Sequence, residues 1–298
     1  MYELVQINDN NYYINSLAKI GIYVKENLDA YLIDSGNDKD AGRKVKKILE
    51  EKGWKLKGIL NTHSNADHIG GNQYLQNQTG CKIFSEGIEA AITENTVLEP
   101  SFLYGGFPFK DLRHKFLMAK DSKVTPFSDK EFPKDFKIVP LPGHFFDMVG
   151  YITPDNVFYM ADCLSGREIL EKYKIVFIYD VGSYVETLEK VKTIKADVYV
   201  PSHAEVGSNI EELAQYNIDK VYEVAEDILN ICKEKIVFEE ILQRLFIDYG
   251  LKMNYEQYVL VGSTVRSYLS WLKDSGKVNA VFENSKMYWE TVKECAKW

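Results

Sequence analysis

Two histidines and an aspartate are crowded into the segment LNTHSNADHIGG, directly after an apolar run. These residues are His63, Asp67 and His68, and Asn65 lies between them. Imidazole and carboxylate groups in combination are the ligands that zinc and similar divalent ions prefer. The segment therefore predicts a metal site, with an amide at the position where a third imidazole would complete the cluster.

Two further histidines and a second aspartate occur in the same kind of place. His144 follows the apolar run IVPLPG, His203 follows VYVPS, and Asp162 ends the run VFYMAD. A single histidine after a strand is more often a hydrogen-bonded structural residue than a ligand. Four histidines and two aspartates in this setting predict a metal centre, and of the five histidines only His114 lacks the setting.

The elements that would position these residues alternate between strands and helices. Apolar runs at 18–24 and 30–33 predict strands, and residues 38–53 have helical spacing. The segment LKGILNTH predicts a buried strand that brings His63 to its C-terminal end. Ligands in layered α/β folds gather at such strand ends, where loops converge. The remaining predicted elements are a helix at 70–80, a strand at 81–84, a short helix at 86–95, three strands within 136–162, a helix at 184–194, a strand at 197–203 and a long helix at 209–233.

An aromatic insertion at 96–130 interrupts this alternation, with phenylalanines and tyrosines around Gly105 and Gly106. One interpretation is a mobile lid or apolar wall over the metal centre, with the glycine pair as its hinge. The alternative is a packed satellite core or a dimer contact.

The pattern changes after residue 235. Helical segments at 238–250 and 255–276 precede a hairpin at 277–290 with ENSK at its turn, which is typical of a winged-helix-like module. We therefore predict two domains, 1–235 and 236–298. From residue 236 onward eight basic residues are balanced by eight acidic ones, whereas phosphate binding needs a basic face. A nucleic-acid partner is not expected, and the module is interpreted as a structural cap or a homodimer contact.

Composition limits the class of protein. The net charge of −8 provides no global positive field to attract nucleic acid. The N-terminus lacks a basic start and an apolar stretch typical of a signal peptide, and no run reaches the roughly 18–20 apolar residues of a membrane helix. The four cysteines are far apart and form no CxxC pair. Together these features predict a soluble cytoplasmic protein with reduced thiols.

The combined motifs resemble the metallo-β-lactamase-fold hydrolases. That family has the pattern H-x-H-x-D-H, then a distant histidine after a glycine, a bridging aspartate and a last histidine; HSNADH, PGH, AD and PSH match it in order. The resemblance covers about residues 10 to 205. It implies an α/β fold, a four-layer αβ/βα sandwich.

The resemblance also implies two adjacent metal sites. One would use Asp67, His68 and His203, with Asp162 as a bridge between the sites. The other would use His63, His144, Asp162 and position 65. There the chain departs from the family, because Asn65 offers a neutral amide oxygen, a poorer zinc ligand than imidazole but one that hard cations accept. We expect one or two divalent ions, zinc first, with manganese or iron as alternatives.

The family's chemistry is attack by a metal-bound hydroxide, with Asp67 carried over as the catalytic residue that ligates metal and orients the nucleophile. The expected substrate is a small ester, thioester or lactone, as in the family's glyoxalase II-like and lactonase branches. The alternatives are a phosphodiesterase or ribonuclease, and a non-hydrolytic iron redox or sensor protein. Phe107 in the insertion and Tyr179 in FIYDVGS are the candidate substrate-binding residues.

Overall fold

The apolar runs of the first part of the chain form a seven-stranded sheet. In this computed structural model, which describes residues 2–292, the strand order is β1-β2-β3-β4-β5-β6-β7. The first four strands pair antiparallel and β4 to β7 pair parallel, so the carboxyl ends of β4 and β5 lie at one edge. The strands are β1 (Glu3–Gln6), β2 (Asn11–Asn15), β3 (Ile20–Val24), β4 (Asp29–Ile33), β5 (Lys55–Leu60), β6 (Lys82–Phe84) and β7 (Val124–Thr125).

A second sheet of four strands follows, in the order β11-β10-β9-β8. Its β10 and β11 pair parallel, and the other neighbours pair antiparallel. The carboxyl ends of β10 and β11 therefore also lie at a common edge. These strands are β8 (Lys137–Pro140), β9 (Val149–Ile152), β10 (Val157–Ser165) and β11 (Val198–His203).

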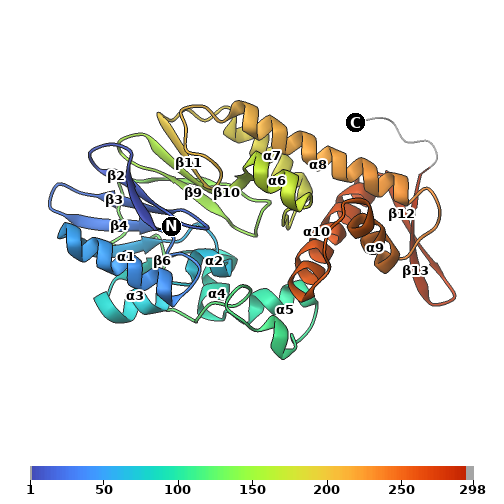
Figure 1. Cartoon of the computed structure of the whole chain (residues 1–298), viewed down its shortest axis with the longest axis horizontal. Coiled ribbons are helices and arrows are strands. Elements are labelled where there is room, and N and C mark those ends of the chain that lie inside the picture. The colour runs from blue at the N-terminus through green and yellow to red at the C-terminus, as the bar shows by residue number, and fades with distance from the viewer. Residues whose placement is uncertain (1, 293–298) are drawn as a thin grey trace.

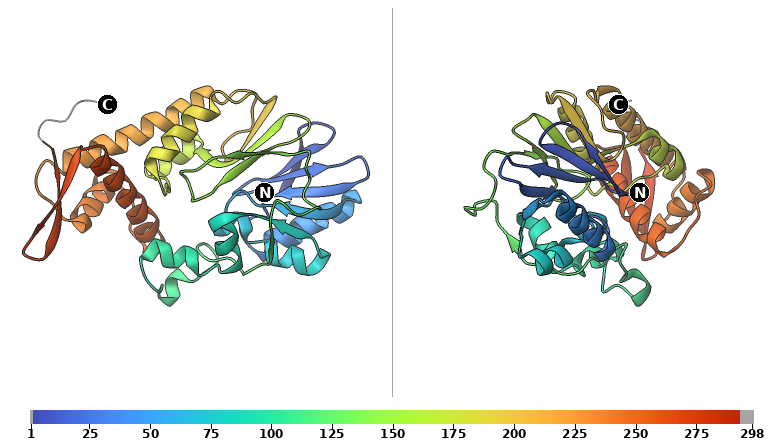
Figure 2. Two further views of the ribbon diagram at one scale, coloured as in Figure 1. Left: turned by 180° about the vertical axis from the view of Figure 1, so that it is seen from behind. Right: turned by 60° about the vertical axis from the view of Figure 1, so that its left-hand side comes forward.

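Alternating side chains along the strands divide the core into layers. Tyr23 and Leu60 of the first sheet pack with Tyr151 and Tyr159 of the second. The opposite face of the first sheet packs against α1 (Lys39–Lys52) and α3 (Asn72–Thr79), and that of the second against α7 (Val181–Val191) and α8 (Glu211–Ile231). Both faces of each sheet are thus covered, as continuous apolar runs predict, and the helices flank the two sheets in Figures 1 and 2. The predicted four-layer αβ/βα sandwich is confirmed.

The helices follow the sequence pattern closely. Asp38 caps α1 by accepting a 2.9 Å hydrogen bond from the backbone N–H of Ala41, and Gly53 ends it in the left-handed region. The helices of this part are α1 (Lys39–Lys52), α2 (Ala66–Ile69), α3 (Asn72–Thr79), α4 (Gly87–Glu94), α5 (Leu98–Tyr104), the 3-10 turn η1 (Lys110–Leu112), α6 (Arg167–Tyr173), α7 (Val181–Val191) and α8 (Glu211–Ile231). Four short helical segments, α2, α5, η1 and α6, are additions to the predicted set.

The C-terminal part consists of α9 (Phe238–Asp248), α10 (Tyr255–Asp274) and the hairpin of β12 (Val278–Glu283) and β13 (Lys286–Thr291). Their apolar side chains belong to the same core cluster as those of α7, α8 and β10. The winged-helix-like character and the boundary at 235/236 stay predictions. No helix among residues 2–292 is long and apolar enough to cross a membrane.

The aromatic insertion lies against the C-terminal part. Leu103, Leu112 and Leu117 form a small apolar cluster with Val259 of α10, and α5 lies beside the end of α10 in Figures 1 and 2. His114, the histidine without a strand-end setting, pairs with Glu256 at 3.0 Å. The segment from α5 to η1 is therefore packed, as the satellite-core alternative describes.

Candidate metal centre

The predicted ligands converge at the common edge of the two sheets. His63 follows β5, and the single turn of α2 that begins after Asn65 carries Asp67 and His68. The second sheet contributes Asp162 within β10 and His203 at the end of β11. Residues far apart in sequence meet here because both sheets direct their carboxyl strand ends to this edge.

Two ligand groups can be distinguished by their distances. In the first, here called the Asp67 group (Asp67, His68 and His203), the candidate ligand atoms lie within 4.8 Å of one another. The second, here called the Asn65 group (His63, Asn65 and His144), has His144 Nε2 3.2 Å from Asn65 Oδ1.

Asp162 lies between the groups. Its Oδ1 is 3.2 Å from His68 Nε2, and its Oδ2 is 3.1 Å from His203 Nε2 and 3.7 Å from His144 Nε2. Asp162 thus lies within 4 Å of histidines of both groups, and its role as a bridge between two metal ions stays a prediction.

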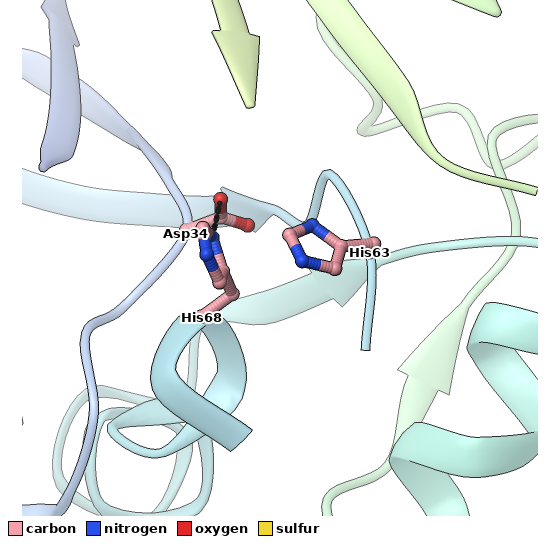
Figure 3. Close-up of side chains that lie close together, drawn as sticks. All are labelled: Asp34, His63 and His68. Carbon is pink, nitrogen blue, oxygen red and sulfur yellow. Dashed lines mark hydrogen bonds and ion pairs between the residues drawn. The ribbon is translucent and has the colours of Figure 1, made fainter. Parts of the chain in front are cut away.

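The tautomers of His63 and His68 are fixed by their neighbours. His68 Nδ1 lies 2.8 Å from Asp34 Oδ2, an acceptor, so it carries the proton. Thr62 Oγ1 donates its proton to the same Asp34 oxygen at 2.7 Å and therefore accepts from His63 Nδ1 at 2.9 Å. Figure 3 shows the two rings beside the Asp34 carboxylate. Both rings consequently direct Nε2 toward the other candidate ligands.

Burial lowers the pKa of His63 well below its usual value, so its Nε2 is unprotonated. Although burial disfavours the charged ring, Asp162 and Asp67 raise the pKa of His68 well above its usual value, so without a metal ion its Nε2 carries a proton.

His144 has the same arrangement with a different partner. Its Nδ1 donates to the backbone carbonyl oxygen of Phe177 at 3.0 Å, which leaves Nε2 as a lone pair toward Asn65 and Asp162. Burial, followed in size by the opposing Asp162 carboxylate, leaves the pKa of His144 below its usual value, which favours the neutral ring.

These residues fit a divalent cation. His63 Nε2, His68 Nε2 and Asp162 Oδ1 are buried and have no hydrogen-bond partner among the described residues. Buried polar atoms without partners are rare and costly. A cation would stabilise imidazole nitrogens and a carboxylate oxygen that are buried together without partners, and an imidazole that donates Nδ1–H to a carboxylate or carbonyl is the usual arrangement of a metal ligand.

The electrostatics lead to the same conclusion. Burial opposes ionisation, yet His203 and His68 hold the pKa of Asp162 well below its usual range. Although burial disfavours the charged ring, Asp162 and Asp67 raise the pKa of His203 to about 10. Without a metal ion, a proton on His203 offsets the carboxylates, and a cation would take over that role.

The backbone is specialised where the site is built. Ala161 and Asp34 have φ of 54° and 63°, in the left-handed region that residues other than glycine seldom adopt. Ala161 also lies at an irregularity in the β10–β11 register. Gly143 has φ of 120°, and a Cβ there would lie 2.3 Å from the backbone N of Tyr184. Such strain is typical of functional sites. Here Ala161 directly precedes Asp162, and Gly143 directly precedes His144.

Two buried acids were not among the predicted site residues. Asp34 ends the segment LID and is 2% exposed; its position after a strand was the available signal. Glu99 of α5 is 4% exposed, and its Oε1 accepts a 2.8 Å bond from Asn65 Nδ2. Burial raises the pKa of Glu99 well above its usual value. No sequence signal joined a glutamate of the insertion to the ligand motif.

The predicted substrate-binding residues lie in different settings. The ring centroid of Tyr179 lies 4.0 Å from that of Phe146, with the two planes tilted by 38°. The backbone N–H of Tyr179 donates to the carbonyl oxygens of Gly143 and His144. Phe107 is 75% exposed, with the Arg113 guanidinium 5.1 Å from its ring centroid. Their substrate contacts stay predictions.

A cleft of about 1110 Å³ borders the centre on the side of His203. It lies between the β2–β3 turn, the start of α6 and the segment after β11, and Lys19 and Arg167 contribute to its lining. Lys19 Nζ donates to the carbonyl oxygen of Ala204 at 2.5 Å. The side chain of Asp67 is 41% exposed whereas that of His68 is fully buried, so Asp67 forms the solvent side of the centre.

Comparisons with known proteins agree with this geometry. A sequence profile of the metallo-beta-lactamase superfamily matches residues 22–203, a range that ends on His203. A hydroxyacylglutathione hydrolase from Methylococcus capsulatus is 46% identical over 39 residues, which are 13% of this chain and 15% of that protein.

Two solved structures share the fold over nearly the whole chain. A metallo-beta-lactamase family protein from Thermus thermophilus aligns with a TM-score of 0.71 at 14% identity, covering 97% of each chain. A beta-lactamase domain protein from Burkholderia ambifaria aligns with a TM-score of 0.69 at 14% identity, covering 97% of this chain and 94% of that one. The chain therefore belongs to the metallo-beta-lactamase superfamily, as a metallo-hydrolase of that superfamily.

Proposed function

We propose that the chain hydrolyses a small ester, thioester or lactone with one or two divalent metal ions at this edge of the sheets. The observation that carries the proposal is the fixed orientation of three histidine rings. His63, His68 and His144 each donate from Nδ1, so that all three Nε2 atoms face the Asp162 carboxylate and its neighbours. The Asp67 group with Asp162 would hold one ion, and the Asn65 group with Asp162 would hold the other.

A bound divalent ion would acidify a water molecule toward neutral pH and polarise a carbonyl oxygen. The chain's own residues would do the remaining work. The exposed Asp67 carboxylate would accept a hydrogen bond from the attacking water and orient it. Asp34 and the Phe177 carbonyl would keep His68 and His144 from rotating.

The substrate class rests on two further observations. The cleft beside His203 has room for a small molecule, and Lys19 at its edge offers an ammonium group to a substrate oxygen. The short match to a hydroxyacylglutathione hydrolase favours a thioester among carbonyl substrates. The balanced charge after residue 236 gives no support to a phosphodiester polymer.

The test combines elemental analysis with a substrate panel. The chain purified without added metal, and the same chain loaded with zinc, manganese or iron, would be assayed on a hydroxyacyl glutathione thioester, p-nitrophenyl acetate, a lactone and bis-p-nitrophenyl phosphate. We expect at least one bound ion and turnover of a carbonyl substrate that falls by roughly a hundredfold or more in Asp67→Ala. A metal-free chain after every loading, or hydrolysis of the phosphodiester alone, would overturn the proposal.

A further inference from the structure

Both ends of the Asn65 side chain are engaged. Its Nδ2 donates to Glu99 Oε1 at 2.8 Å, and its Oδ1 lies 3.2 Å from His144 Nε2. Because His144 donates from Nδ1, its Nε2 has no proton to give to Oδ1. The amide oxygen therefore faces a lone pair rather than a donor.

This orientation departs from the usual use of asparagine at a helix start. Asn65 is the N-cap of α2, where the side-chain oxygen ordinarily accepts a backbone N–H of the first turn. Here Asn65 forms no such bond, and the backbone N–H of Ala66 interacts with Glu99 instead. Glu99 takes over part of the capping, and the amide of Asn65 is turned toward the metal centre.

The opposite orientation of the amide would suit the histidine better. With the amide turned by 180°, Nδ2 would donate to the bare His144 Nε2, but Oδ1 would then face Glu99 Oε1. Oε1 accepts from Asn65 when the Glu99 carboxyl group is ionised or protonated on Oε2, and in both forms it favours the observed orientation. Glu99 thus decides which atom of Asn65 points into the Asn65 group.

We propose that Glu99 is a positioning residue that fixes Asn65 so that its amide oxygen serves as a ligand in the Asn65 group. The inference rests on the proposed function, since it requires a cation at that group. It gives the insertion a role in the centre, because α5 delivers Glu99 from 34 positions away in sequence. An oxygen at this position makes the group more favourable for manganese or iron, relative to zinc, than a third imidazole would.

The first test measures stepwise affinity for Zn²⁺ and Mn²⁺ in competition with a chromogenic chelator. Glu99→Leu leaves the amide free to turn, and we expect the weaker binding step to lose roughly 10- to 100-fold in affinity while the tighter step is retained. The side-chain amide in Glu99→Gln can either accept or donate a hydrogen bond. The affinity of its weaker binding step should therefore lie between those of the natural chain and Glu99→Leu. Thermal unfolding of the metal-free variants checks that each one folds.

The same substitution in an Asn65→Asp background distinguishes an effect on the orientation of residue 65 from general support of the fold. In Asn65→Asp both ends of the side chain are oxygens, so its orientation no longer matters. Glu99→Leu should therefore leave metal binding in Asn65→Asp within about threefold, although it weakens binding in the natural chain by roughly tenfold or more. Equal losses in the two backgrounds would overturn the inference and leave Glu99 a structural residue.

Glu89 provides the matched control. It is buried as deeply, at 2% exposed, but it accepts from the backbone N–H groups of Ser64 and Asp147 and from Ser64 Oγ. Glu89→Gln should lower stability and leave the ratio of the two affinities within about threefold of the natural chain. If the natural chain binds no ion, the proposed function fails; if it binds ions and Glu99→Leu leaves both steps unchanged, only this inference fails.

Discussion

The two ligand groups share one scaffold and one bridging carboxylate, yet they differ in charge. The Asp67 group contains a carboxylate of its own, and the Asp34 carboxylate supports its His68. In the Asn65 group the corresponding ligand is a neutral amide, and the histidines are held by a hydroxyl and a carbonyl oxygen. A divalent ion is therefore attracted by one unit charge less at the Asn65 group. We therefore expect the Asp67 group to bind a divalent ion more tightly than the Asn65 group.

Removal of the bridge should have the largest effect, because Asp162 is the only predicted ligand that both groups share. We expect Asp162→Ala to weaken both binding steps and to lower turnover by roughly a thousandfold, equivalent to about 4 kcal/mol of transition-state stabilisation. Steady-state kinetics and metal titration of the same preparation measure both quantities. Loss of only one step would mean that Asp162 belongs to a single group.

A matched pair of histidine variants tests the ranking itself. His203→Ala should weaken the tighter step by roughly 100-fold, and His144→Ala should weaken only the other step, by roughly tenfold. His203 faces two carboxylates whereas His144 faces Asp162 and an amide. Stepwise titration of each variant provides the comparison, and equal losses would contradict the proposed difference in charge.

The sequence was sufficient to predict which side chains converge at the edge of the sheets, because strand ends are readable. An apolar run that stops at a histidine becomes a strand whose carboxyl end lies at this edge, as His63 and His203 illustrate. The four-layer arrangement was implied by the resemblance to the metallo-β-lactamase fold, and the burial of both sheets on both faces agrees with it. Local pattern and fold agree here because a parallel strand leaves its loop at the same edge as its neighbour.

The supporting residues could not be read in the same way. Asp34 carries no motif beyond its position after β4, and Glu99 acts through a tertiary contact across a segment whose pattern was irregular. Whether the insertion packs or moves depends on what it contacts, and its partner Val259 lies far along the chain in α10. Hydrogen bonds between side chains that are distant in sequence leave no periodic pattern from which they could be predicted.

Restoring the imidazole should narrow the difference between the groups. We expect Asn65→His to raise zinc affinity at the weaker step by roughly tenfold and to bring bound zinc to two ions per chain, since imidazole is the better zinc ligand. Elemental analysis of both proteins purified without added metal measures the change. Two zinc ions already in the natural chain would show that the amide is tolerated, and the expected gain would then be absent.

The smallest effect concerns support of the Asn65 group from α10. Ser267 Oγ donates to the carbonyl oxygen of Tyr179 at 2.6 Å, close to the Phe177 carbonyl that orients His144. Ser267→Ala should lower the free energy of unfolding by about 1 kcal/mol, the net value of one such hydrogen bond. Among the described residues the Asp67 group has no contact with the segment 177–179, so the affinity of the binding step at that group should be unchanged. The Asn65 group should lose threefold or less in affinity. Urea unfolding and metal titration of the variant measure both effects. An equal loss at both steps would mean that α10 supports the whole edge of the sandwich rather than one side of the centre.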